Sequence, residues 1–297
     1  MPTETVYGLA GDATSDLAIR RIFEVKGRPA TNPLIVHVPT KSDATRLAAN
    51  WNDMAEKLAD RFWPGALTIV VASNGLISPL ATAGKSTVGL RIPAHDMALK
   101  LLRSSGLPLA APSANKSNHI SPTRAEHVRA DFAESQVALV LDGGPCSVGI
   151  ESTVISVAGA ARAGQPRAKI LRPGGISQRE IEAVIGEVDV FTGSKDASIE
   201  LDSPGQLAVH YAPKTPAFRF EHAQRQNLKL DNAAIVDLTL DPKTYARNLY
   251  ARLRLLDTQG LAAIYLECPP DSPDWVAVRD RVMRATKPLP QQAKSDG

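Results

Sequence analysis

The chain has 297 residues, of which 43% are hydrophobic and 22% charged, and its formal net charge is +3 at pH 7. This length allows a substantial core and favours two domains, while the charge falls far short of a basic tail or patch that alone would indicate nucleic-acid binding. The two cysteines, Cys146 and Cys268, are far apart and form no CxxC pair, which argues against a disulfide framework or a zinc site. The N-terminus lacks a signal-peptide pattern and no apolar run approaches the roughly 18 residues of a membrane span, so we expect a cytoplasmic protein without a membrane partner.

Helical and strand patterns alternate through the first two thirds of the chain. Helices are expected where apolar residues recur every three or four positions, and strands where apolar, often β-branched, residues form short runs. The expected helices cover residues 17–26, 42–62 and 97–102, a segment opened by Ser121-Pro122-Thr123, and a segment that starts at a capping box of Ser177 and Glu180. The expected strands cover residues 34–38, 67–72, 88–92, 107–111, 137–142, 153–157 and 169–171.

The last third of the chain has a separate organisation. Residues 193–215 show no sustained period, and we expect them to be an interdomain linker. Beyond the linker, a strand at 233–238, a helix at 242–259, a strand at 262–268 and a helix at 275–285 alternate as β-α-β-α. The sequence therefore predicts one domain at 1–192 and a small second domain at 216–297.

Residues 24–37 combine two cations with a stiff turn and a buried strand. Lys26 and Arg28 flank Gly27, which permits a sharp bend, and Pro29 and Pro33 restrict the backbone. Such a segment suits an anion, although these residues taken alone are better explained as a solvated turn. The strand that follows is of the kind beside which α/β proteins place ligand sites.

Common catalytic motifs are missing. The triplet Gly84-Lys85-Ser86 has Pro79 where a phosphate-binding loop needs its first glycine. The six histidines form no HExxH pattern and no serine lies in GxSxG. Polar residues do gather at the ends of predicted strands, and such cations and hydroxyls suit a phosphate-rich substrate. They are Lys26, Arg28, Arg91, Ser113, Asn115, Ser152, Thr153 and Arg172.

Six ordered motifs resemble the YrdC-like threonylcarbamoyl-adenylate synthases. They are PTETVYGL at 2–9, KGRP at 26–29 with NPL at 32–34, TVGLRIP at 87–93, APSAN at 111–115, EST at 151–153 and LRPG at 171–174. The linker motifs SPG at 203–205 and HYAP at 210–213 resemble those of the two-domain form. The second domain resembles its family counterpart mainly in pattern and in VRDR at 278–281.

The resemblance implies an enzyme and a fold. Members of the family are nucleotidyltransferases that convert L-threonine, bicarbonate and ATP to threonylcarbamoyl-AMP and pyrophosphate, the first step of N6-threonylcarbamoyladenosine formation in tRNA. The implied fold is an α/β (α+β) domain with a twisted mixed sheet and flanking helices, followed by a small Rossmann-like domain. Mg²⁺ is expected with ATP. The expected partners are the downstream tRNA threonylcarbamoyl-transfer machinery and, weakly, tRNA itself.

The resemblance also assigns roles to individual residues. The catalytic signature around the phosphates would be Lys26, Arg28, Ser113 and Asn115. Binding of ATP would involve Arg28, Asn32, Thr87, Ser113, Ser121, Arg172 and Tyr211, the last as a lid from the linker. Binding of threonine would involve Thr5, His37, Arg91, Ala111 and Ser152, with Arg91 facing the threonine carboxylate.

The chain departs from the family pattern at two places. Family members usually carry a further helix and strand ahead of the PTET motif at which this sequence starts, so we expect either a misassigned start or a shortened chain, with an uncovered sheet edge. Asn118 stands where a glycine is usual, and asparagine tolerates a positive φ better than most residues do.

Two alternatives come from other classes. A YrdC-like module could bind double-stranded RNA or tRNA without catalysis, although the modest net charge argues against this as the main role. A carbamoyl-transfer accessory enzyme that uses carbamoyl phosphate would be expected to carry zinc-finger and acylphosphatase-like segments, which we do not find.

Overall fold

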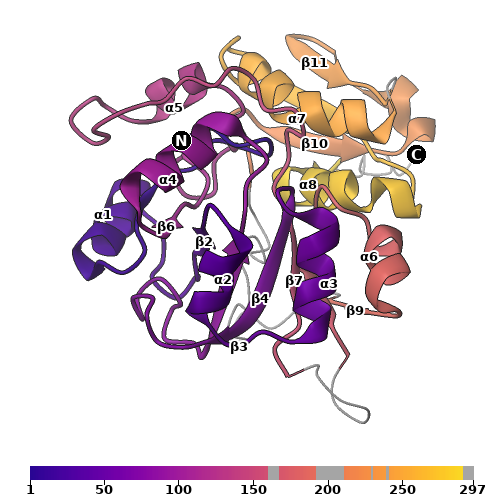
Figure 1. Cartoon of the computed structure of the whole chain (residues 1–297). Coiled ribbons are helices and arrows are strands. Elements are labelled where there is room, and N and C mark those ends of the chain that lie inside the picture. Colours follow the sequence, from indigo (N-terminus) through magenta and orange to yellow (C-terminus); the bar gives the residue numbers. More distant parts are fainter. Residues whose placement is uncertain (160–166, 192–210, 229, 239–240, 290–297) are drawn as a thin grey trace.

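The computed structural model describes residues 1–159, 167–191, 211–228, 230–238 and 241–289. Its described strands form two sheets, one of nine strands and one of four. Figure 1 shows the smaller sheet with its helices, in orange and yellow, lying against one end of the larger unit. The predicted fold class, a twisted mixed sheet with flanking helices and a small second α/β unit, is confirmed.

The larger unit alternates helices and strands. Its helices are α1 (Asp16–Lys26), α2 (Lys41–Leu47), α3 (Asp53–Phe62), α4 (Asp96–Ser105), α5 (Ala125–Asp131) and α6 (Gln178–Ile185). Its strands are β1 (Gly11–Asp12), β2 (Ile35–His37), β3 (Ala48–Asn50), β4 (Leu67–Ser73), β5 (Thr87–Arg91), β6 (Leu109–Ala110), β7 (Thr153–Ser156), β8 (Lys169–Arg172) and β9 (Asp189–Val190). They are ordered β1-β6-β2-β5-β4-β7-β8-β9, with β3 beside β4.

The period of two along the central strands separates a core face from a cavity face. One face packs against α1, α3 and α6 through residues such as Leu67, Ile69 and Val71 of β4. Their neighbours Thr68 and Val70 point to the other face and line a small cavity. The alternation therefore leaves one face of the sheet available for polar side chains.

The smaller unit contains four parallel strands. They are ordered β11-β12-β10-β13, with β10 (Ala217–Phe220), β11 (Ala233–Val236), β12 (Ala263–Glu267) and β13 (Lys287–Pro288). Helix α7 (Pro242–Asp257) follows β11 and helix α8 (Val276–Ala285) follows β12, as the sequence predicts, and the short helices η1 (His222–Asn227) and η2 (Pro273–Trp275) complete the unit. The linker motif SPG at 203–205 and His210 lie outside the described residues, and the domain limits at 192 and 216 remain our proposal.

Three predictions of local structure are wrong. The helix predicted over 42–62 is divided into α2, β3 and α3, because the Asn52 side chain accepts a hydrogen bond from Ala55 and caps a new helix. Residues 137–142 form no strand, and Leu139 in this run is 69% exposed, so it lacks the neighbours that stabilise an extended chain. Helix α5 starts at Ala125, three residues beyond Pro122, whose carbonyl accepts from the amide of Tyr7.

No helix among the described residues is long and apolar enough to cross a membrane.

Candidate functional site

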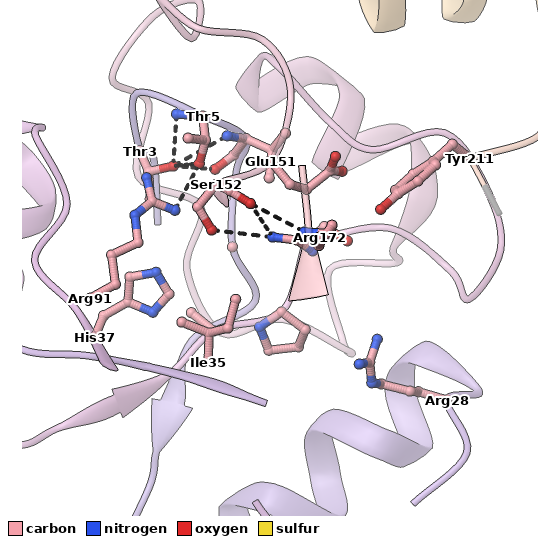
Figure 2. Close-up of a pocket in the computed structure, with 15 residues that line it drawn as sticks. Thr3, Thr5, Arg28, Ile35, His37, Arg91, Glu151, Ser152, Arg172 and Tyr211 are labelled. Atoms are coloured by element: carbon pink, nitrogen blue, oxygen red, sulfur yellow. Dashed lines mark hydrogen bonds between the residues drawn. The ribbon is translucent and has the colours of Figure 1, made fainter. Parts of the chain in front are cut away.

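A cavity on the open face of the larger sheet gathers residues from distant parts of the chain. Figure 2 shows His37 and Arg91 at one end, Tyr211 at the other, and Ser152 with Arg172 between them. Nine of the fourteen residues that the sequence assigned to the site line this cavity. These nine are Thr5, Arg28, His37, Arg91, Ala111, Ser113, Ser152, Arg172 and Tyr211.

The parallel register of β2 and β5 places His37 beside Arg91. The guanidinium of Arg91 is buried and donates from Nη2 to Glu4 Oε1 over 2.7 Å, from Nη1 to Thr5 Oγ1 over 2.9 Å, and from Nε to the Gly65 carbonyl over 3.0 Å. A guanidinium has five N–H groups, so these contacts leave two for another acceptor. This end of the cavity can therefore bind a carboxylate.

His37 is held neutral at this end. Burial and then the nearby charge of Arg91 lower its pKa to about 3. Its buried Nδ1 has no hydrogen-bond partner among the described residues. A neutral imidazole with an unused nitrogen is suited to a polar contact with a bound molecule.

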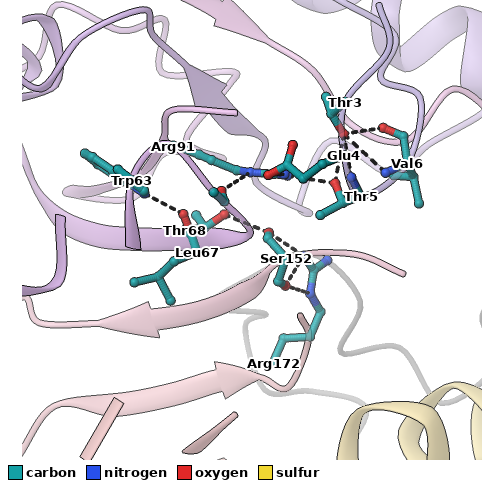
Figure 3. Close-up of polar contacts among 11 residues, drawn as sticks. Thr3, Glu4, Thr5, Val6, Trp63, Leu67, Thr68, Arg91, Ser152 and Arg172 are labelled. Carbon is teal, nitrogen blue, oxygen red and sulfur yellow. Dashed lines mark hydrogen bonds and ion pairs between the residues drawn. The ribbon is translucent and has the colours of Figure 1, made fainter. Parts of the chain in front are cut away.

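Ser152 joins two strands in the middle of the cavity. Its hydroxyl lies 2.8 Å from Thr68 Oγ1 and accepts from Arg172 Nη2 over 3.2 Å, while its carbonyl accepts from Arg172 Nη2 over 2.8 Å (Figure 3). Arg172 is 4% exposed, and burial lowers its pKa. The strand ends of β7 and β8 thus hold a hydroxyl and a guanidinium together.

Arg28 brings a second buried guanidinium to the cavity. It is 9% exposed and contacts the carbonyls of Asn32 and Pro33 through Nε and Nη2. Burial lowers the pKa of Arg28 to about 10, and repulsion from Arg172 acts in the same direction. Two desolvated cations facing one cavity favour binding of a polyanion.

Lys26 lies behind the cavity. Its Nζ donates to the carbonyls of Ser113 and Asn115, each over 2.5 Å, so it holds the loop that carries Ser113. Burial and then repulsion from Arg28 lower the pKa of Lys26 well below its ordinary value. The side-chain amide of Asn115 donates to the carbonyls of Lys116 and His119, and its buried Oδ1 has no partner in the described part of the chain.

Three further predicted residues also lie outside the cavity lining. Asn32 is 1% exposed behind Arg28. Thr87 lines a smaller cavity on the same sheet face, which shares Ile35 with the first. Ser121 donates from its hydroxyl to Glu151 Oε1 over 2.6 Å. These residues are adjacent to the cavity through a shared neighbour.

Tyr211 closes the end of the cavity that faces the smaller unit. It is 1% exposed, has a φ of 64°, and its ring lies 5.6 Å from that of Tyr250. The amide of Ala212 donates to the Asn118 carbonyl over 3.0 Å. Asn118 itself has a φ of 68°, the conformation in which a glycine would be favoured. The Asn118 loop therefore anchors the chain just after Tyr211.

Sequence reasoning missed two acidic residues of the site. Glu4 pairs with Arg91, and Glu151 lines the cavity while it accepts from Ser121 and from Arg281 of α8. Burial opposes the charge of Glu151, but Arg281, Arg172 and the Ser121 hydroxyl lower its pKa to about 2. Both acids lie inside family motifs, Glu4 in PTET and Glu151 in EST. Because buried arginines require a counter-charge, an acid in such a motif is a candidate partner for the predicted arginines.

Among the described residues no group of three or more His, Cys, Asp or Glu side chains could hold a metal ion. The cavity's own carboxylate, Glu151, is paired with Arg281.

Two family models match most of the chain. The Sua5/YciO/YrdC model, described as telomere recombination, matches residues 1–174. The model described as the C-terminal domain of threonylcarbamoyl-AMP synthase matches residues 176–286.

Individual proteins are similar over nearly the whole chain. The threonylcarbamoyl-AMP synthase of Bacillus subtilis is 40% identical over 311 aligned positions, which cover 96% of this chain and 88% of that protein. The threonylcarbamoyl-AMP synthase of Pyrococcus abyssi is 36% identical over an alignment that covers 96% of this chain and 89% of that protein. The crystal structure of P. abyssi Sua5 complexed with L-threonine has a TM-score of 0.86 and 35% identity, covering 97% of this chain and 91% of that one.

Proposed function

The chain belongs to the YrdC-like threonylcarbamoyl-AMP synthase family, and from this premise we propose that it makes threonylcarbamoyl-AMP and pyrophosphate from L-threonine, bicarbonate and ATP. The amino group of threonine adds to bicarbonate, and loss of water leaves a carbamate. A carbamate oxygen attacks the α-phosphorus of ATP and pyrophosphate leaves, which makes the enzyme a nucleotidyltransferase. No protein nucleophile is needed, so the protein contributes positioning and charge stabilisation.

One observation carries this proposal. A single cavity is lined by Arg91, which would receive a carboxylate, and by Arg28 and Arg172, which would receive a polyanion. The reaction joins an amino acid to a nucleotide and requires both kinds of site side by side.

The threonine end would be formed by β2, β5 and the N-terminal motif. The two remaining N–H groups of Arg91 would receive the threonine carboxylate, oriented by Glu4 and Thr5. His37 would offer its unprotonated nitrogen, and the Ala111 main chain and Ser152 would complete the contacts.

The nucleotide end would be formed by the cationic turn and the strand ends. Arg28, Arg172 and the Ser113 segment held by Lys26 would stabilise the charge that develops on the phosphates. Residues just behind the cavity lining would support these contacts, namely Asn32, Asn115, Thr87 and Ser121. Tyr211 would exclude water.

Magnesium would accompany ATP. The ligands proposed for it are phosphate oxygens and water, because Mg²⁺ keeps several waters and is commonly bound through substrate phosphates. The labile mixed anhydride would then pass to the machinery that transfers threonylcarbamoyl to tRNA, with at most a weak contact between this chain and tRNA itself.

The test is pyrophosphate release by the purified full-length chain. We expect release from ATP that depends on both L-threonine and bicarbonate, and transfer of labelled bicarbonate carbon into an AMP-linked product. Release that continues without threonine would overturn the substrate assignment.

A further inference from the structure

The carboxylate of Glu151 connects the cavity with the smaller unit. Its Oε1 accepts from Ser121 of the larger unit, whereas its Oε2 accepts from Tyr250 of α7 over 3.0 Å and from Arg281 Nε of α8 over 2.9 Å. Two of these three partners therefore come from the second domain.

Arg281 also reaches Tyr211. The Arg281 side chain is fully buried, and its Cζ lies 5.3 Å from the centre of the Tyr211 ring, at cation–π distance. Its Nη1 donates to the Pro173 carbonyl over 3.0 Å and to Asp280 over 2.7 Å. One guanidinium thus contacts both Glu151 and Tyr211, which line the nucleotide end of the cavity.

The second domain packs directly against the backbone that carries Glu151. A Cβ atom added to Gly149 would lie 2.4 Å from Arg247 Cα of α7, so no side chain fits between the helix and the 149–151 backbone. Elsewhere on the same boundary, Arg254 Nη2 binds Asp131 over 2.6 Å. The latter contact joins the domains without contacting Glu151 or Tyr211.

We propose that Arg281, although it belongs to the C-terminal domain, is a positioning residue for the nucleotide end of the site. It holds the Glu151 carboxylate and the Tyr211 ring in place, with Tyr250 as its auxiliary. The inference rests on the proposed function. The threonine end is held within the larger unit, because Arg91 donates to Glu4, Thr5 and the Gly65 carbonyl. We therefore expect Arg281 to affect the binding of ATP and not that of threonine.

The test compares Arg281→Gln with two controls in the threonine- and bicarbonate-dependent assay. Arg279→Gln removes another guanidinium from α8, one that contacts the Pro269 carbonyl. Asp131→Asn removes the carboxylate charge that pairs with Arg254 across the domain boundary, while Arg254 keeps its bonds to the Ile120 and Ser121 carbonyls. For Arg281→Gln we expect the KM for ATP to rise about tenfold or more and the KM for threonine to change by less than about twofold, since misplacement of a positioning group by about 1 Å can cost up to about a hundredfold.

The controls distinguish a positioning role of Arg281 from a general effect of weakened contact between the two domains. We expect Arg279→Gln and Asp131→Asn to keep both KM values within about twofold of the parent. A reduced kcat with both KM values unchanged, or an equal rise of both KM values, in Arg281→Gln would overturn the inference. An inactive parent enzyme would instead contradict the proposed function.

Circular dichroism and thermal melting would reveal whether Arg281→Gln misfolds. A second variant tests the inference in that case. Tyr250→Phe removes only the hydroxyl that donates to Glu151. We expect it to raise the KM for ATP about threefold, less than the full cost of one hydrogen bond to a charged group, because Arg281 still holds the Glu151 carboxylate. If Tyr250→Phe has the parent KM for ATP, the inference is wrong.

Discussion

The ammonium of Lys26 donates a hydrogen bond to the main-chain carbonyl of Asn115 over 2.5 Å. A second bond goes to the Ser113 carbonyl, and the amide of Ser117 donates back to the Lys26 carbonyl. The lysine of the KGRP motif therefore fixes the loop 113–117, whose Ser113 lines the cavity. The catalytic role that we propose for Lys26 and its structural role depend on the same contacts.

Replacement of Lys26 by alanine should reduce both turnover and stability. Two buried carbonyls lose their donor, which we expect to cost about 2 kcal/mol of unfolding free energy, and the displaced Ser113 wall should lower kcat by about a hundredfold or more. Urea unfolding and the pyrophosphate assay measure the two effects. Lys57→Ala on the exposed side of α3 is the control, and turnover of Lys26→Ala close to that of this control would contradict the assignment.

Replacement of Tyr211 by alanine should weaken ATP binding. The ring closes one end of the cavity and packs against Tyr250 and Arg281. We expect the Kd for ATP to rise about tenfold or more, which corresponds to about 1.4 kcal/mol, as measured by titration calorimetry. Tyr245→Ala removes a similarly buried ring from the second-domain core beside Trp275. Equal losses of ATP affinity in both variants would count against a lid.

His37 should remain neutral throughout the physiological range. Its folded-state pKa of about 3 lies below the ordinary value of 6.5, so on acidification the unfolded chain takes up the proton first. Its contribution to stability is therefore present above pH 6.5 and is lost as the pH falls toward 3. We expect constant imidazole NMR shifts for His37 from about pH 8 to about pH 5, with the signals assigned from a His37→Gln spectrum. A titration midpoint within this range would refute the neutral assignment.

The Glu151 carboxylate should stabilise the fold except in strong acid. Its pKa falls from 4.5 to about 2 on folding, so its contribution is complete above 4.5 and is lost as the pH drops through that interval. Because Glu151→Gln removes the negative charge that the buried Arg281 guanidinium contacts, we expect a loss of about 3 kcal/mol near neutral pH. The difference in unfolding free energy between the variant and the parent should shrink toward pH 3. A difference that does not change with pH would show that the charge of Glu151 is unimportant.

A methyl group at Gly174 should disturb the site directly. A Cβ there would lie 2.4 Å from the Glu151 carbonyl oxygen and 2.4 Å from the Thr153 nitrogen. We expect Gly174→Ala to shift the main chain of the EST motif and to lower kcat/KM about a hundredfold. Gly84→Ala is the control for backbone strain without a close contact, because Gly84 has a φ of 73° but a Cβ there meets nothing within 4 Å. If both variants have similar kcat/KM values, the close approach at Gly174 is not important for the site.

Local patterns predicted most of the elements well. The apolar spacing of 17–26 became α1, and Ser177 with Glu180 formed the expected capping box of α6. The failures had two causes, a side chain that capped the main chain and a segment that lacked a neighbouring strand. Asn52 starts a new helix inside a continuous apolar period, and the 137–142 run has strand composition but no adjacent strand. Propensity describes a segment alone, whereas strands depend on their neighbours.

The sequence by itself determined the family motifs, the alternation of helices and strands, and the identity of nine residues that line the cavity. Only the tertiary structure decided how these residues are held. It paired Arg91 with Glu4, turned Lys26 toward two carbonyls, and brought Arg281 from the far end of the chain to Glu151. Buried charges require partners, and those partners are chosen by which strands and helices meet in space, a relation that spacing along one chain does not contain.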